Sequence, residues 1–302
     1  MPRLTAASLR ALARTAPPLA AEVATRFFFR VGPPAAVRPQ ERVAHEAARR
    51  STIRYRRPAT TGREPVDVVV YAWGEPGAPG VLLVHGWQSR ASFFAPLVED
   101  LVASGLRVVA YDAPAHGDSG GRRRTIVDDV AIVHRLSDAE PAPWEGIVGH
   151  SAGALAAGVA LADGVAARRF TSVSGPSAAS ALADGFFAIT GLPRSLRQRF
   201  DDVVRRRRFP DVPDIYERYD LTRRPVPGAV PALLLHDTDD RQVPYRHAER
   251  MLAAHADSAE LVTTTGLGHN RILRDPAVRR SVLDHLAAPV PARSGAGERC
   301  RQ

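Results

Sequence analysis

The stretch WEGIVGHSAGALAAGVALADG, residues 144–164, decides the fold of this chain. A short apolar run leads directly into GHSAG, whose central residue is Ser151, and a segment of small helix-forming residues follows. A serine at such a strand-to-helix turn has a strained backbone, which lifts its Oγ clear of the sheet. A side chain at Gly149 or Gly153 would collide with the neighbouring strand or helix. The pattern therefore predicts a nucleophile, Ser151, at a helix N-terminus whose free N–H groups stabilise a developing anion.

Strand-length apolar runs alternate with helix-length segments on both sides of this stretch, from residue 51 to residue 288. Such alternation indicates a mostly parallel, twisted sheet with helices on both faces. The strand-like runs lie at 66–73, 81–85, 107–111, 146–149, 169–173, 231–236 and 260–264. The helix-like segments lie at 92–103, 125–139, 151–162, 245–256 and 276–287. The first strands, near 51–56 and 66–73, are expected to pair as an antiparallel hairpin at the edge of the sheet.

The alternation breaks once, between Gly175 and Val230. These roughly 55 residues contain helix-like pieces and a proline-rich return but no strand-like run, and an insertion of this size usually forms a lid or cap. We therefore expect a basic helical arm over 1–50, an α/β core made of 51–175 and 229–288, a helical cap over 176–228, and a disordered tail over 289–302.

Composition excludes several classes of protein. No run approaches the roughly 18 apolar residues that a membrane-spanning helix requires. Cys300 is the single cysteine and cannot form an internal disulfide, so nothing requires an oxidising compartment. All 41 basic residues are arginine, which excludes Schiff-base chemistry on a lysine. We expect a cytoplasmic protein, peripheral to a membrane at most, that needs no cofactor and binds no nucleic acid.

The net charge of +9 is concentrated in the first 60 residues, which hold twelve arginines, three glutamates and no aspartate. A secretion signal fits this segment poorly, because proline, glutamate and arginine interrupt its apolar residues. Two interpretations remain open. The segment is a basic amphipathic element that rests on an anionic membrane surface, or it packs its phenylalanine side chains against the rest of the protein.

The motif VLLVHGW, residues 81–87, is an apolar strand that ends in HGW. Together with GHSAG it resembles the α/β-hydrolase superfamily, in which HG closes the third strand. The resemblance covers roughly residues 60–288. It implies that the backbone N–H groups of Trp87 and Ala152 form the oxyanion hole, where side-chain identity is secondary. We interpret His85 as a residue that holds the loop rather than as the catalytic base.

The segment YDAPAHGDS, residues 111–119, resembles the family's D-x-x-G-x-G-x-S loop, whose role is structural. It departs from that pattern at Ala115 and His116, where a Gly-His pair is more usual. Several residues in and after this loop could be imagined as metal ligands, but their spacing matches no known ligand pattern. We therefore expect no metal. The residues considered are His116, Asp118, Asp128, Asp129 and His134.

The segment ALLLHDTDDRQVPYRHAE, residues 232–249, brings a cluster of aspartates to the end of a strand. It is similar to the family pattern H-G-x-x-D-x-x-V-P, in which His236 matches the first position and Asp240 the acid. Asp237 stands where glycine is usual, so Asp237 and Asp239 remain rivals for the role of the acid. A solvated acidic loop is the other interpretation of this segment.

The segment TGLGHNRILRDP, residues 265–276, places one histidine in a glycine-rich loop after the last strand. The chain order is serine, aspartate, histidine, and each member follows a strand of its own. This order predicts that His269 takes the proton of Ser151 while Asp240 holds the correct imidazole tautomer and stabilises the imidazolium.

These residues predict hydrolysis of a small-molecule carboxylic ester or thioester through an acyl-enzyme, with amide, lactone, carbon–carbon and acyl-transfer reactions still open. The cap is expected to select the substrate through an apolar lining that includes Phe186, Phe187 and Leu192. Two alternatives are a lipid hydrolase recruited to a membrane surface by residues 1–60 and a non-catalytic ligand-binding member of the fold.

Overall fold

The computed structural model describes residues 6–57, 65–212 and 214–289. Within these ranges the chain forms an eight-stranded sheet in the order β1-β2-β4-β3-β5-β6-β7-β8. Neighbours from β4 through β8 pair in parallel, which confirms the predicted mostly parallel sheet. The strands are β1 (Arg49–Tyr55), β2 (Val66–Trp73), β3 (Gly80–Val84), β4 (Arg107–Tyr111), β5 (Gly146–His150), β6 (Phe170–Val173), β7 (Ala232–Asp237) and β8 (Ala259–Thr264).

The edge strand β1 pairs antiparallel with β2, as the hairpin prediction required, and Ile53 lies opposite Val68. β1 is mostly exposed and carries three arginines, and such charges discourage another chain from pairing with an open edge. The central strands β3, β5, β6 and β7 are buried along their whole length. Their continuous apolar sequences suit a sheet that is covered on both faces.

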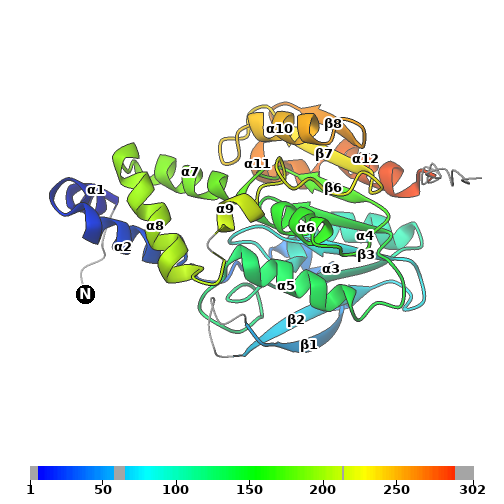
Figure 1. Ribbon diagram of the computed structural model, residues 1–302. Coiled ribbons are helices and arrows are strands. Elements are labelled where there is room, and N and C mark those ends of the chain that lie inside the picture. The colour runs from blue at the N-terminus through cyan, green and yellow to red at the C-terminus, as the bar shows by residue number, and fades with distance from the viewer. Residues whose placement is uncertain (1–5, 58–64, 213, 290–302) are drawn as a thin grey trace, which may run out of the picture.

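Helices cover each face of the sheet over a separate apolar core (Figure 1). One core includes Leu155 and Met251, and the other includes Leu101 and Val282. The helices over the first core are α5 (Ile126–Ser137), α6 (Ala152–Ala162) and α10 (Arg246–Ala254). Those over the second are α3 (Arg42–Ala47), α4 (Ala95–Ala103), α11 (Gly268–Arg271) and α12 (Pro276–Ala287).

Residues 174–231, here called the insertion, connect β6 to β7, and those that the structure describes (all but residue 213) form helices and no strand. These helices are α7 (Ala179–Thr190), α8 (Arg197–Arg208) and α9 (Ile215–Arg218). Aromatic rings hold α7 to α8: the Phe187 ring meets the Phe200 ring edge-on at 5.3 Å, and the Phe186 ring stacks on it at 6.0 Å. The insertion is therefore a packed helical layer, and its buried side chains continue the apolar core that includes Leu155.

Two helices lie near the N-terminus, α1 (Ala6–Thr15) and α2 (Pro17–Phe28); α2 packs against α8, and α1 packs against α2 (Figure 1). Pro17 and Pro18 occupy the first turn of α2, where a missing N–H leaves no helical hydrogen bond unmade. No helix in the described ranges is both long and apolar enough to cross a bilayer. The predicted disordered tail lies outside the described residues from residue 290 onward.

Candidate active site

Ser151 occupies the turn between β5 and α6, with φ +55° and ψ −127°. A Cβ on Gly149 would lie 2.3 Å from the Cα of Ala154, and one on Gly153 would lie 2.2 Å from the carbonyl oxygen of Val84. Strand, turn and helix are therefore too close together for any residue but glycine at these two positions. This packing holds Ser151 in a sparsely populated backbone conformation, which costs of order 1–3 kcal/mol.

Asp240 comes from the turn after β7 and His269 from the short helix α11 after β8, and the structure brings both to Ser151. The His269 Nε2 lies 3.0 Å from the Ser151 Oγ, and its Nδ1 lies 2.7 Å from the Asp240 Oδ2. A carboxylate can only accept hydrogen bonds, so the ring proton of His269 is on Nδ1. The unprotonated Nε2 therefore accepts a hydrogen bond from the Ser151 hydroxyl. All three residues are at most 8% exposed. The three thus form one continuous, buried chain of hydrogen bonds.

The Asp240 carboxylate is held in its charged form. Its Oδ1 accepts hydrogen bonds from the backbone N–H groups of Gln242 and Val243, at 2.8 and 2.9 Å. Burial by itself would raise the pKa of Asp240, but the hydrogen bond and charge of His269 and these two N–H groups outweigh it and hold the pKa below its usual value. A negative charge is therefore fixed next to Nδ1 of the imidazole.

The two rival aspartates bind the backbone of the histidine loop instead of the imidazole. Asp237 Oδ2 accepts from the Leu267 N–H at 3.0 Å and from the Thr264 hydroxyl at 2.7 Å. Asp239 Oδ2 accepts from the Gly266 N–H at 3.0 Å. The aspartate cluster thus divides its contacts: Asp240 faces the ring, while Asp237 and Asp239 hold the loop that carries it.

His150, which was not identified from the sequence, holds the backbone of His269 in place. Its Nε2 donates to the His269 carbonyl oxygen at 2.9 Å, and its ring lies 4.9 Å from the His269 ring. Burial, followed by the nearby His269, lowers the pKa of His150 to about 3, so this ring stays neutral. The one signal in the sequence is its position directly before the nucleophile, at the buried end of a strand.

The turn after β3 packs against the nucleophile. A Cβ on Gly86 would lie 2.9 Å from the Ser151 Cβ, and both Trp87 and Ala152 line the cavity that contains Ser151. His85 accepts from the Ala113 N–H at 2.9 Å through Nε2, and its Nδ1 donates to the Gly86 carbonyl at 2.7 Å. His85 therefore ties the turn after β3 to the loop after β4, as its interpretation from the sequence required.

Arg124 is a second residue that the sequence analysis missed. Its guanidinium donates to the carbonyl oxygens of Gly86 at 2.7 Å and His85 at 2.9 Å, and to the Asp129 carboxylate at 2.8 Å. The side chain is 1% exposed and lies 5.9 Å from the centre of the Trp87 ring. Burial raises the pKa of Asp129 to about 6, against the opposing effect of Arg124. Nothing in the local run GRRRT distinguishes this arginine from its neighbours.

A cavity of about 270 Å³ opens at Ser151 and His269 and is lined mainly by apolar side chains. Phe186 lines it, but Phe187 and Leu192 do not, which corrects their predicted place in the site. Consecutive helical residues point about 100° apart. When Phe186 faces the cavity, Phe187 must face the interior of the insertion, where its ring meets Phe200.

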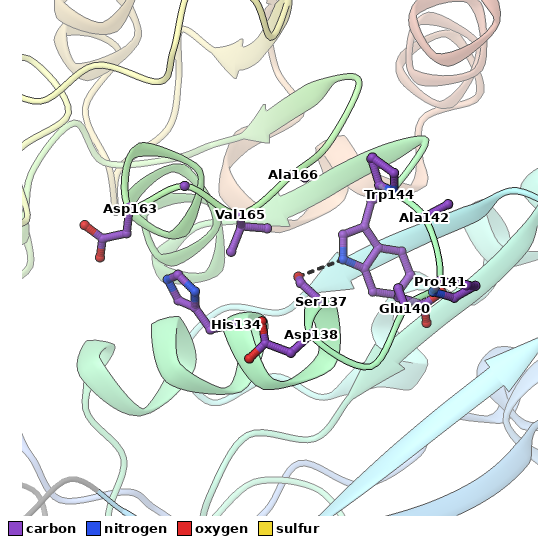
Figure 2. Close-up of a pocket in the computed structure, with 12 residues that line it drawn as sticks. His134, Ser137, Asp138, Glu140, Pro141, Ala142, Trp144, Asp163, Val165 and Ala166 are labelled. Atoms are coloured by element: carbon purple, nitrogen blue, oxygen red, sulfur yellow. Dashed lines mark hydrogen bonds between the residues drawn. The ribbon is translucent and has the colours of Figure 1, made fainter.

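A second hollow, of about 370 Å³, lies at the other end of the central strands, where β5 begins (Figure 2). It includes Trp144, which precedes β5, whereas Ser151 follows the other end of that strand. Its polar side chains, such as His134 and Asp138, are therefore a strand length away from the nucleophile. In the parts of the chain that the structure describes, no group of three or more histidine, cysteine, aspartate or glutamate side chains is arranged to hold a metal ion.

Comparison with known proteins finds a family model and a relative that match this chain. Residues 81–280 match the model of the alpha/beta hydrolase family. The chain is 26% identical over 255 residues to a pimeloyl-(acyl-carrier protein) methyl ester esterase of Xylella fastidiosa, which covers 70% of this chain and 96% of that protein.

Solved structures share the fold. An esterase of Pyrococcus furiosus superimposes with a TM-score of 0.59 at 22% identity, covering 84% of this chain and 98% of the other. A thioesterase domain from the curacin biosynthetic pathway superimposes with a TM-score of 0.56 at 20% identity, covering 78% and 99%. At these identities the likeness concerns the fold alone.

Proposed function

Because the chain belongs to the alpha/beta hydrolase family, we propose that it hydrolyses carboxylic esters or thioesters with Ser151 as nucleophile, His269 as general base and Asp240 as the acid. The observation that carries the proposal is the buried chain of hydrogen bonds from Asp240 through His269 to Ser151, at 2.7 and 3.0 Å. The named activity of the Xylella fastidiosa relative, an ester hydrolysis, supports it. Replacing Ser151 tests the proposal.

Acylation follows from this arrangement. The Ser151 Oγ attacks the carbonyl carbon of the ester while His269 Nε2 takes the hydroxyl proton. The charge of Asp240 stabilises the imidazolium that forms. The proton then passes from Nε2 to the leaving alcohol or thiol, the carbon–oxygen or carbon–sulfur bond breaks, and the acyl group stays on Ser151.

Deacylation uses the same base. Water attacks the acyl carbon, His269 takes its proton, and the proton returns to Ser151 as the carboxylic acid leaves. In both half-reactions the carbonyl oxygen becomes an oxyanion, and we assign the backbone N–H groups of Trp87 and Ala152 to receive it. Donors fixed before the reaction stabilise the transition state more than the substrate, and losing one costs about 10²–10³ in kcat.

Arg124 is expected to act as a positioning residue for this oxyanion hole, because its guanidinium binds the carbonyl oxygens of His85 and Gly86. The Gly86 carbonyl lies in the same peptide plane as the Trp87 N–H, so fixing it fixes the direction of that donor. Arg124→Lys keeps a positive charge beside Asp129 but removes the planar fork that binds two oxygens at once. Misplacing one oxyanion donor should lower kcat about 10-fold to 100-fold. Steady-state kinetics on p-nitrophenyl acetate should show this fall with KM changed less than about twofold.

The matched control is Arg107→Lys. Arg107 also pairs with a carboxylate, that of Glu140, and its guanidinium lies 5.8 Å from the centre of the Trp144 ring. Both partners, labelled in Figure 2, lie at the end of the sheet where β5 begins, away from Ser151. This change should lower the melting temperature and leave kcat near the wild-type value. An equal fall in kcat in both variants would show that the loss at Arg124 is a general effect of destabilisation.

Phe186 is expected to contact the acyl group of the substrate, with the insertion acting as a cap over the site. Phe186→Ala should widen the cavity and lower kcat/KM for p-nitrophenyl octanoate about tenfold or more, because each lost methylene contact is worth about 1–3 kcal/mol. Activity on the acetate should change little, since the residues around Ser151 stay in place. Phe187→Ala is the control: it creates a void inside the insertion and should lower stability without the same shift in preference.

A further inference from the structure

The N-terminal helices take part in the cavity at Ser151. Phe28 is the last residue of α2, Phe29 follows it directly, and both line the cavity that also includes Ser151, His269 and Phe186. We propose that the arm, the name used here for α1, α2 and Phe29, contributes the far wall of an acyl-binding cavity through Phe28 and Phe29, and that Phe28 determines the preference for long apolar acyl chains. The inference rests on the proposed function, which is hydrolysis of an ester or thioester. It adds the class of acyl group and a residue that selects it.

Aromatic contacts join the arm to the insertion. The Phe28 ring meets the Phe186 ring at 5.4 Å and the Phe200 ring at 5.5 Å, both edge-on. The Phe29 ring meets the Phe209 ring at 5.8 Å in the same manner. Edge-to-face pairs at these separations are favourable beyond the area that they bury. The wall of the cavity is therefore one aromatic cluster with members from two distant parts of the chain.

One side of the arm is packed into the protein. Ala20, Ala21 and Ala24 of α2 are fully buried, because small side chains let α2 lie close to α8. Leu9 of α1 is buried as well. The Arg10 guanidinium of α1 donates a hydrogen bond to the carbonyl oxygen of Thr190, the last residue of α7, at 2.9 Å. This burial makes the arm a fixed wall in the structure rather than a loosely attached segment.

The chemistry of the lining indicates the ligand. Near Ser151 the cavity includes the charged pair of Arg124 and Asp129, whose groups bind each other at 2.8 Å. The remaining lining is mostly aliphatic and aromatic, with contributions from the arm, α8 and α9. The arm contributes Phe28 and Phe29, α8 contributes Val204, α9 contributes Ile215, and Phe209 lies directly after α8. An uncharged alkyl chain fits such a lining, because it loses water from its surface and leaves no polar group unpaired.

The decisive variant is Phe28→Ala in the full chain. We expect kcat/KM for p-nitrophenyl acetate to stay within about twofold of the wild type, and kcat/KM for p-nitrophenyl octanoate to fall about tenfold or more. Phe27→Ala is the matched control, because Phe27 is the neighbouring phenylalanine of α2 and is not part of the lining. If Phe28→Ala shifts the octanoate-to-acetate ratio no more than Phe27→Ala does, the arm is not a wall of the acyl site.

A double variant tests contact with a shared ligand. Because Phe28 and Phe186 are in ring contact, their effects on octanoate should not add: the double variant Phe28→Ala/Phe186→Ala should lose less than the product of the two single losses. If Phe28→Ala fails to fold, Phe28→Leu replaces it, with the same direction of change and a smaller size. Strict multiplication of the single losses would contradict a common binding surface.

A binding experiment separates this inference from the proposed reaction. In a Ser151→Ala background, octanoic acid is titrated by calorimetry with and without Phe28→Ala, and we expect about tenfold weaker binding when Phe28 is lost. Suppose that the wild-type protein cleaves no ester but this difference appears: the proposed function fails and the acyl wall stands. If esters are cleaved and Phe28→Ala changes neither binding nor chain-length preference, the wall fails and the proposed function stands.

Discussion

Ser151→Ala should lower the turnover of p-nitrophenyl acetate by a factor of about 10⁴ to 10⁶, the range found when the nucleophile of a serine triad is removed. The alanine keeps the Cβ that packs against Gly86 and removes the one oxygen that lies 3.0 Å from His269 Nε2. Stopped assays with millimolar substrate and high enzyme concentration would measure the residual rate.

The fold of this variant should be intact, and circular dichroism with a thermal melt checks that. Alanine has the same β-carbon as serine, so the close packing of β5 on α6 is unaffected. A folded Ser151→Ala protein that keeps most of its activity would overturn the whole assignment, because no other nucleophile is assigned to the site.

Asp240→Asn should lower kcat by about 10⁴. The N–H groups of Gln242 and Val243 would keep the amide oxygen at the Oδ1 position, so the amide N–H would face His269 Nδ1, where the structure places a carboxylate oxygen at 2.7 Å. The imidazole would then favour the tautomer with its proton on Nε2, which cannot accept from the serine. The measurement is kcat for p-nitrophenyl acetate across the plateau of the pH–rate profile.

Asp237→Asn and Asp239→Asn are the matched controls within the same loop. Each replaces a carboxylate that accepts from the backbone N–H of residue 266 or 267 by a neutral amide, and a hydrogen bond to a charged group contributes about 1.5–3 kcal/mol, more than one between neutral groups. Both variants should therefore melt at lower temperature and keep kcat within about tenfold of the wild type. A loss near 10⁴ at position 237 or 239, with Asp240→Asn close to normal, would move the acid to that residue.

Local patterns in the sequence were sufficient for the sheet and for the turn at Ser151. The runs predicted at 66–73, 107–111 and 276–287 have the same bounds as β2, β4 and α12. Apolar periodicity, the glycines of the elbow and the proline that begins α12 act within a few residues, so a single sequence contains them. The hairpin of β1 and β2 followed from the short separation of two apolar runs.

Other features depend on contacts that no local pattern contains. The orientation of α7 is set by its partner α8, so the sequence could not show that Phe186 faces the cavity and Phe187 does not. Arg124 has its role because β3 ends beside it in space. Phe28 reaches the cavity only through contacts with residues more than 150 positions later in the chain.

The contact between Phe28 and Phe186 also has a consequence for biosynthesis. A ribosome adds about 5–20 residues per second, so the arm waits of order ten seconds or more before α7 and α8 have been made. During that time Phe28 and Phe29 lack their ring contacts with Phe186, Phe200 and Phe209. Closing so long a loop is entropically costly and slow, so this contact forms late in folding. The cavity at Ser151 is therefore completed only after the strands that carry the nucleophile have been synthesised.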